Sequence, residues 1–154
     1  MPHVRPNLRL LLVGEPFGAG LGASAAARWL ARGLRDGGLP GPDVLTLPGG
    51  LSAGPELQEL LDQEHLPRRL DDARALLIAT ARLDGEMLQD TPAFELATRA
   101  RQGGVPCYAV TAENGLDSFQ ERILDLQRVL RAGAPRSLLA AGRTLAREVL
   151  AGLR

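Results

Sequence analysis

The sequence predicts an α/β fold: a three-layer, Rossmann-like arrangement in which a mainly parallel sheet is covered by helices on both faces. Short aliphatic runs alternate along the whole chain with longer segments whose leucines and alanines recur at helical spacing. Glycine- and proline-rich stretches separate the two kinds of segment, as turns and helix ends require. The chain has 154 residues, 45% of them hydrophobic, so we expect one domain over residues 1–154.

Five segments are expected to form strands. Four are aliphatic runs bounded by turn residues, as strands buried on both faces of a parallel sheet are: 8–13, 44–47, 75–79 and 105–110. The fifth segment, residues 123–129, has a pattern that fits either a strand or a helix. We favour an edge strand there, preceded by a short helix that ends near Arg122.

Helices are expected between these strands, each with apolar residues on one face. Thr91 and Pro92 are typical of an N-cap and a first helical position, and Asp117 with Gln120 matches a capping box. The expected helical segments are 21–35, 56–64, 91–101, 117–122 and 135–153.

Composition excludes several classes of function. Eighteen arginines balance eighteen acids, so no net charge favours binding to nucleic acid or to anionic lipid. No apolar run is long enough to span a bilayer and no secretory signal is recognised, so we expect no membrane partner and a cytoplasmic location. The single cysteine, Cys107, is interpreted as a core residue. His3 and His65 have no ligand-type neighbours at metal-binding spacing, so no metal site is expected.

A glycine-rich loop, residues 14–22, lies between the first strand and the first helix, where α/β folds bind anions. A phosphate-binding P-loop requires a lysine, and the chain contains none. Gly20, Gly22 and Ala25 match a dinucleotide fingerprint, but no acid follows the second strand to bind a ribose. Two interpretations stay open: the small residues let an anion approach, with the Ser24 hydroxyl beside it, or they let the helix pack tightly on the sheet.

Three carboxylates follow expected strands: Glu15, Asp84 and Glu113. They either converge on one cleft, as metal ligands or a general base, or are ordinary exposed acids of loops. Neither histidine is placed for a Ser-His-Asp arrangement, so no catalytic residue is assigned.

Three blocks of the sequence resemble the two-domain bacterial glycerate kinases. The stretch VGEPFGAGLGASAAARWLARGLR is similar to that family's P-D-S-F-K-G-S-L-S-A segment and the alanine-rich helix after it. IATARLDGEMLQDTP resembles T-G-E-G-R-L-D-G-Q-S-L-x-G-K-A-P, and GVPCYAVTAENGLD resembles G-V-P-V-x-A-L-A-G-x-x-G-L-D. The blocks occur in the family's order. The resemblance implies a Rossmann-like core from an enzyme that transfers the γ-phosphoryl of ATP to glycerate with magnesium, in a cleft beneath an inserted second domain.

The same resemblance implies that the active site is degenerate. Glu15 and Gly18 stand where the family has an aspartate and a lysine, and Thr91 stands where it has a second lysine. Its acidic D-G-G-E-G loop corresponds to residues 50–54, which contain no acid. Only residues 51–72 occupy the place of the inserted domain. Phosphoryl transfer depends on positioning and positive charge, so their loss argues against kinase activity.

We therefore expect a binding protein more than an enzyme: a degenerate glycerate-kinase-like domain that binds a small carboxylate or phosphate, or that forms a homo-oligomer, without a cofactor. The alternative is a glycerate kinase that uses ATP and magnesium. Arg82 and Asp84, which the family shares, either hold the ligand or pair with each other. The candidate ligand-binding residues are Glu15, Gly18, Gly20, Gly22, Ser24, Thr80, Arg82 and Asp84.

Overall fold

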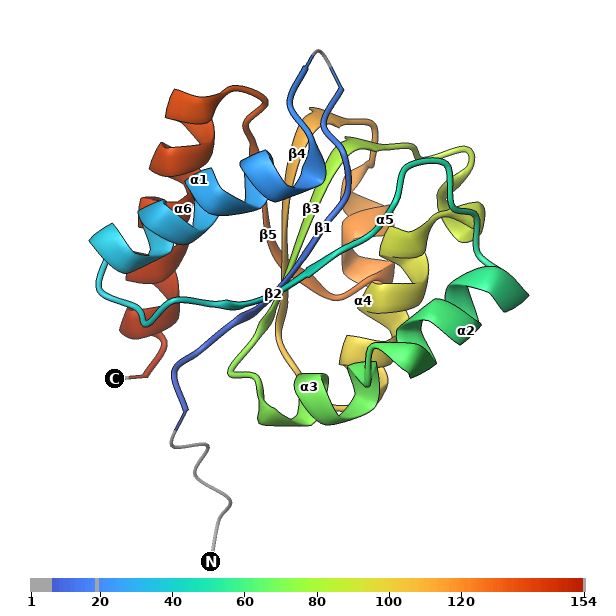
Figure 1. Cartoon of the computed structure of the whole chain (residues 1–154), viewed down its shortest axis with the longest axis horizontal. Coiled ribbons are helices and arrows are strands. Elements are labelled where there is room, and N and C mark those ends of the chain that lie inside the picture. The colour runs from blue at the N-terminus through green and yellow to red at the C-terminus, as the bar shows by residue number, and fades with distance from the viewer. Residues whose placement is uncertain (1–6, 19, 154) are drawn as a thin grey trace, which may run out of the picture.

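In the computed structural model, which describes residues 7–18 and 20–153, five parallel strands form one sheet in the order β2-β1-β3-β4-β5 (Figure 1). The predicted α/β class with a parallel sheet is confirmed. His3 lies outside the described residues. The strands are β1 (Leu11–Gly14), β2 (Asp43–Thr46), β3 (Leu76–Leu83), β4 (Cys107–Asn114) and β5 (Leu126–Arg131).

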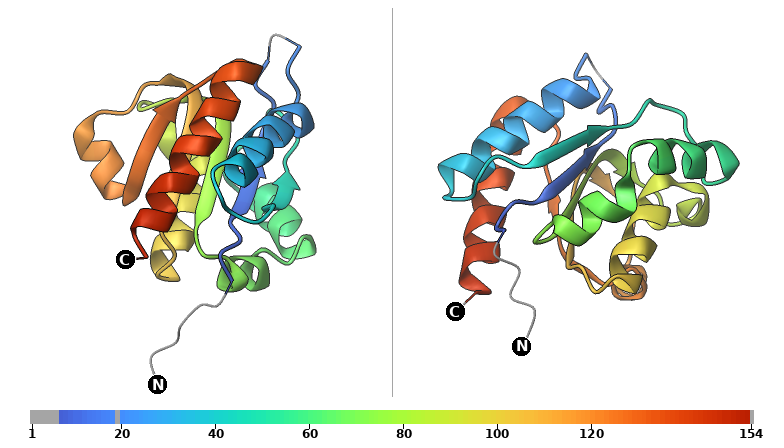
Figure 2. Two further views of the ribbon diagram at one scale, coloured as in Figure 1. Left: turned by 90° about the vertical axis from the view of Figure 1, so that its left-hand side faces the viewer. Right: turned by 60° about the horizontal axis from the view of Figure 1, so that its bottom comes forward.

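Helices cover both faces of this sheet, which gives three layers (Figure 2). One face carries α1 (Ala23–Asp36) and α6 (Pro135–Ala151). The other carries α2 (Pro55–Gln63), α3 (Leu66–Asp72), α4 (Pro92–Gln102) and α5 (Ser118–Ile123), with the short 3₁₀ helix η1 (Leu88–Asp90) before α4.

Alternating side chains of the strands divide the core in two. In β1, Leu11 and Val13 pack toward α2, α3 and α4, whereas Leu12 packs toward α1 and α6. All three side chains are fully buried. This explains why the first three residues of β1 are all aliphatic, since a central parallel strand meets helices on both sides.

The predicted helix starts are confirmed at two places. The Thr91 hydroxyl accepts a hydrogen bond from the Phe94 amide at 3.3 Å, with Pro92 in the first turn of α4. At α5, the Asp117 carboxylate accepts from the Gln120 amide at 2.8 Å, and the Gln120 side chain accepts from the Asp117 amide at 3.0 Å. These caps satisfy amides that a helix start leaves without partners.

Two expectations need correction. The third strand does not end at residue 79 but continues to Leu83, and the fourth continues past residue 110 to Asn114, because β3 and β4 pair with each other over this added length. Helix α3 was not predicted, since seven residues are too few to show a helical period. Residues 123–129 could have formed either a strand or a helix. In the structure, α5 ends at Ile123 and the edge strand β5 begins at Leu126, so the favoured interpretation as an edge strand is confirmed.

The strand order decides where a site is expected. From β1 the chain crosses to β2 on one side, and β3 lies on the other side of β1. Above such a switch point, at the carboxyl ends of β1 and β3, the connecting loops diverge and open α/β sheets usually bind ligands. Over residues 7–18 and 20–153, no helix is both long and apolar enough to cross a membrane.

Candidate functional site

The loop from β1 to α1 rises above the carboxyl edge of the sheet (Figure 1). Gly18 and Gly20 have φ values of 73° and 81°, which residues with a side chain rarely adopt. The backbone closes on itself here: the Phe17 amide donates to the Leu21 carbonyl, and the Leu21 amide donates to the Gly18 carbonyl, each at 2.9 Å. The Phe17 side chain is buried in the core beneath α1 and α6. The glycines therefore shape a tight loop that is anchored to the core.

Helix α1 begins without a side-chain cap. Gly22 is its N-cap residue, and the first turn contains no acid. Such a turn has free amides that favour an anion. Ser24, in the same turn, is exposed and lines a hollow between α1 and β2.

Glu15 and Thr80 come together at the switch point. The Glu15 amide donates to the Ala79 carbonyl at 2.9 Å, which continues the pairing of β1 with β3. Burial raises the pKa of Glu15, and a hydrogen bond with the buried Thr80 hydroxyl partly offsets the rise. A carboxylate at this place repels an anionic ligand, so the arrangement weakens the anion interpretation of the glycine loop.

We expect Glu15→Gln to raise the melting temperature near pH 7. A folded-state pKa above the ordinary 4.5 means that the folded protein binds the proton more tightly than the unfolded chain does. In the wild type, protonated Glu15 therefore stabilises the fold fully when the pH is below the ordinary pKa of the carboxyl. This contribution is lost as the pH rises through the folded-state pKa. The gain over wild type should be present at about pH 7 and vanish at about pH 4 in thermal unfolding. Glu86→Gln, at an exposed position in the turn after β3, is the control. Equal gains in both variants would contradict the explanation.

Arg82 is engaged by two acids. Its guanidinium lies 3.8 Å from the Asp84 carboxylate and 3.8 Å from the Glu113 carboxylate, and its side chain is 66% exposed. Asp84 also accepts backbone hydrogen bonds from the Glu86 amide at 3.0 Å and the Met87 amide at 3.4 Å. The ion pair between Arg82 and Asp84 is thus present, and Asp84 also shapes the turn after β3.

The three loop carboxylates do not converge. Glu15 follows β1, whereas Glu113 belongs to β4, two strands away in the sheet. Throughout the described chain, no three His, Cys, Asp or Glu side chains are grouped so that they could hold a metal ion. The interpretation of Glu15, Asp84 and Glu113 as a joint metal site is therefore wrong, because Asp84 and Glu113 lie beside Arg82 whereas Glu15 is hydrogen-bonded to Thr80.

The candidate residues are divided between separate hollows. Ser24 lines the hollow between α1 and β2, of about 580 Å³. Arg82 and Asp84 line another, of about 430 Å³, with Gly115 and Gln120. The strand order is the reason: β2 lies on one side of β1, and β3 and β4 lie on the other.

Cys107 is buried on β4, and burial raises the pKa of its thiol to about 12. The thiol is therefore protonated near neutral pH, and the thiolate is the nucleophilic form. This agrees with its interpretation as a core residue.

No known protein-family model matches the sequence, and no curated protein is significantly similar to it. The likeness to glycerate kinases thus rests on the three sequence blocks and stays a prediction.

Sequence reasoning missed two groups of residues that the structure makes conspicuous. Arg28, Arg32 and Arg35 recur at helical spacing, and they line the hollow beside β2. Phe119 and Ile123 are four residues apart on the exposed side of α5. Both spacings were visible in the sequence. The sequence did not show which side of each helix faces solvent.

Proposed function

We propose that the chain is a non-catalytic interaction domain that associates with a second copy of itself. The observation that carries this proposal is helix α5, which buries none of its side chains. Phe119 is 64% exposed and Ile123 is 44% exposed, and Met87, on the turn after β3, is 54% exposed. Large apolar side chains gathered on the surface of a soluble domain mark interaction sites.

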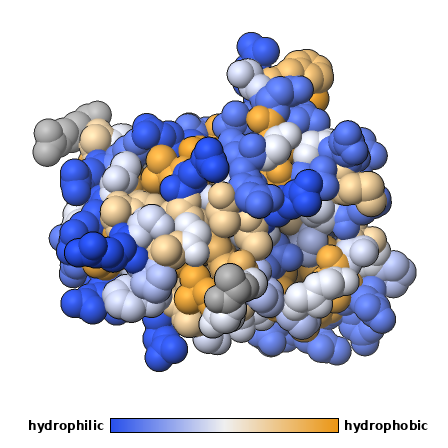
Figure 3. All heavy atoms as spheres, turned by 90° about the horizontal axis from the view of Figure 1, so that it is seen from above, coloured by the Kyte–Doolittle hydropathy of each residue, from blue (hydrophilic) through white to orange (hydrophobic). Residues whose placement is uncertain are grey.

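These three side chains surround one hollow of about 450 Å³, which we call the α5 face. Leu88 and Phe94 also line it. Seen from above the carboxyl edge, hydrophobic residues lie among hydrophilic ones at this end of the molecule (Figure 3). A protruding phenyl ring beside a hollow suits a two-fold interface, since each copy can insert Phe119 into the hollow of the other. Exposed aromatic residues of this kind dominate binding energy in interfaces.

The electrostatics of the carboxyl edge support the non-catalytic part of the proposal. Transfer of a γ-phosphoryl needs positive charge around the migrating group. Here Glu15 and Asp84 directly follow β1 and β3, Glu113 lies near the end of β4, and the Arg82 guanidinium already has two acidic neighbours. Loss of one such electrostatic group reduces the rate by roughly 10²–10³-fold. Magnesium- and glycerate-dependent turnover of ATP, abolished by Asp84→Ala, would instead support the kinase alternative.

We expect Phe119→Asp to convert a dimer into a monomer. The aspartate would place a charge in the apolar centre of the interface, which should weaken self-association by at least about thirtyfold. Light scattering during size exclusion, at several micromolar concentrations, measures the change.

Leu153→Asp is the matched control, because Leu153 is also exposed, at 44%, but lies beyond the end of α6. It should leave the dimer intact. A wild-type protein that is monomeric throughout this range, or equal dissociation of both variants, would overturn the proposal.

A further inference from the structure

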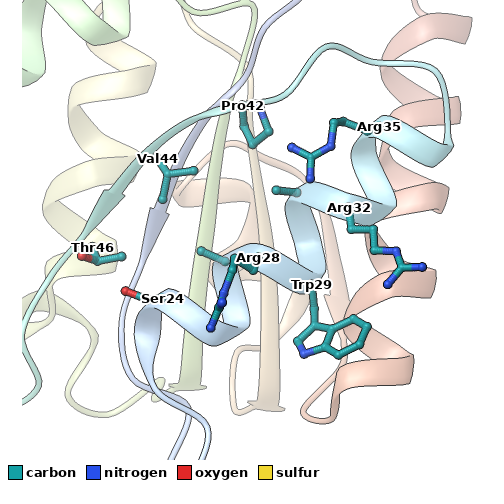
Figure 4. Close-up of a pocket in the computed structure, with 10 residues that line it drawn as sticks. Ser24, Arg28, Trp29, Arg32, Arg35, Pro42, Val44 and Thr46 are labelled. Atoms are coloured by element: carbon teal, nitrogen blue, oxygen red, sulfur yellow. The ribbon is translucent and has the colours of Figure 1, made fainter.

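Helix α1 carries a row of arginines on its exposed side, next to the edge strand β2. Arg28, Arg32 and Arg35 are spaced by four and three residues, so their side chains leave the helix on one face. They line the hollow of about 580 Å³ together with residues of β2 and the turn before it (Figure 4). A site of this volume is within the usual range for small ligands.

The lining of this hollow contains no acid. Asp43, which begins β2, is held by Arg69 of α3 through two hydrogen bonds of 2.9 and 2.8 Å. Asp36, at the end of α1, pairs with Arg143 of α6. Over the part of the chain that the structure describes, no carboxylate pairs with Arg28, Arg32 or Arg35. The three arginines that line the hollow therefore carry a positive charge that no carboxylate of the described residues neutralises.

The rest of the lining suits an organic anion. Pro42 and Val44 form an apolar wall, and Val44 is 40% exposed although it belongs to a strand. The hydroxyls of Ser24 and Thr46 lie at one end of the hollow, where Figure 4 shows the Ser24 side chain directed toward Thr46. Both hydroxyls can donate hydrogen bonds to an anion.

Two of the arginines are held by their neighbours. The Arg32 guanidinium lies over the Trp29 ring, 5.9 Å from its centre, in a cation–π contact. Arg35 lies over Gly41, where an added Cβ would be only 3.2 Å from a guanidinium nitrogen. A partly ordered guanidinium loses less conformational entropy when it binds an anion.

An extended peptide that adds a strand to β2 fits this place less well. The Val44 carbonyl would have to pair with the added strand, but it accepts a hydrogen bond of 3.0 Å from Arg69. The sheet edge is therefore already covered at that point, whereas the hollow above it is open to a small molecule.

The number and spacing of the three arginines indicate which class of anion the hollow can bind. Arg28 and Arg35 are seven residues apart, or about 10 Å along the helix axis. One phosphate can engage only part of such a row, whereas two linked phosphates offer more acceptors, and guanidinium binds phosphate oxygens in a bidentate manner. We propose that the hollow between α1 and β2 binds a small ligand that carries a diphosphate group. This site is independent of the α5 face, because β2 is one edge of the sheet and α5 precedes the strand at the other edge.

The test is titration of the protein with inorganic diphosphate, followed by calorimetry and by the fluorescence of Trp29, the one tryptophan in the chain. We expect binding that perturbs Trp29, that is at least about tenfold tighter than binding of inorganic phosphate, and that weakens as salt is added. The double variant Arg28→Ala/Arg32→Ala should lose at least about tenfold in affinity.

Arg147→Ala is the matched control, since Arg147 is another exposed arginine, on α6. It should bind diphosphate as wild type does. Unchanged thermal unfolding of the variants will show that they are folded, as expected for exposed positions. The proposal is overturned if diphosphate does not bind, if it binds no tighter than phosphate, or if the double variant and the control lose affinity equally. None of these results depends on whether the chain forms a dimer.

Discussion

Replacing Gly142 by alanine is expected to lower the free energy of unfolding by about 1–3 kcal/mol. Gly142 lies where α6 crosses α1, and an added Cβ would be 2.9 Å from the Gly33 Cα and 2.9 Å from the Leu34 amide nitrogen. These are backbone atoms, which cannot rotate away as the end of a side chain can. The two helices must therefore move apart, and Leu30 and Leu34, both fully buried, would lose contacts.

The sign of this effect is informative, because helix propensity alone predicts the opposite. In a helix interior, alanine is favoured over glycine by about 1 kcal/mol. Gly152→Ala, just after the last turn of the same helix, is the control, since its Cβ would lie 3.5 Å from the nearest atom, an ordinary contact. Urea unfolding of both variants measures the difference. If Gly142→Ala is as stable as Gly152→Ala, the explanation by close packing of α1 against α6 at Gly142 is contradicted.

Replacing Phe17 by alanine is expected to lower the free energy of unfolding by about 3–5 kcal/mol. Phe17 belongs to the glycine loop, yet only 7% of it is exposed, and it packs in the core beneath α1 and α6. Its removal leaves a cavity and releases the loop. Amide hydrogen exchange should therefore accelerate at residues 17 and 21, whose amides are hydrogen-bonded within the loop, more than in β1.

Phe119→Ala is the matched control, because the same side chain is 64% exposed there. In the monomer it should change stability by no more than about 0.5 kcal/mol. The comparison also discriminates between the two interpretations of the glycine loop. A loop that is built for packing is destabilised when Phe17 is removed, whereas equal effects of the two substitutions would contradict the packing interpretation.

Much of the fold was predictable because its signals are local. An aliphatic run that ends at Gly14 identifies β1, and the caps at Thr91 and Asp117 mark the starts of α4 and α5 to within a residue. Sequence patterns were weaker predictors where a neighbouring strand decides how long an element is. The third strand continues past residue 79 because β4 extends beside it, and no local feature of that segment reports the length of its neighbour.

The site was less predictable than the fold. Glu15 and Thr80 were both candidates, and they meet because β1 and β3 are neighbours. Ser24 and Arg82 were grouped as parts of one ligand site, yet they line different hollows. Nothing in either segment indicates which strands flank β1.

By itself, then, the sequence determined the alternation of strands and helices, the starts of the capped helices and the absence of any lysine. These depend on residues that are near one another along the chain, where hydrogen bonding and side-chain periodicity act directly. Only the tertiary structure decided that Arg82 lies between Asp84 and Glu113, that α5 leaves Phe119 exposed, and that three arginines of α1 share one hollow with β2. Those arrangements follow from strand order and helix orientation, which the packing of the whole core selects.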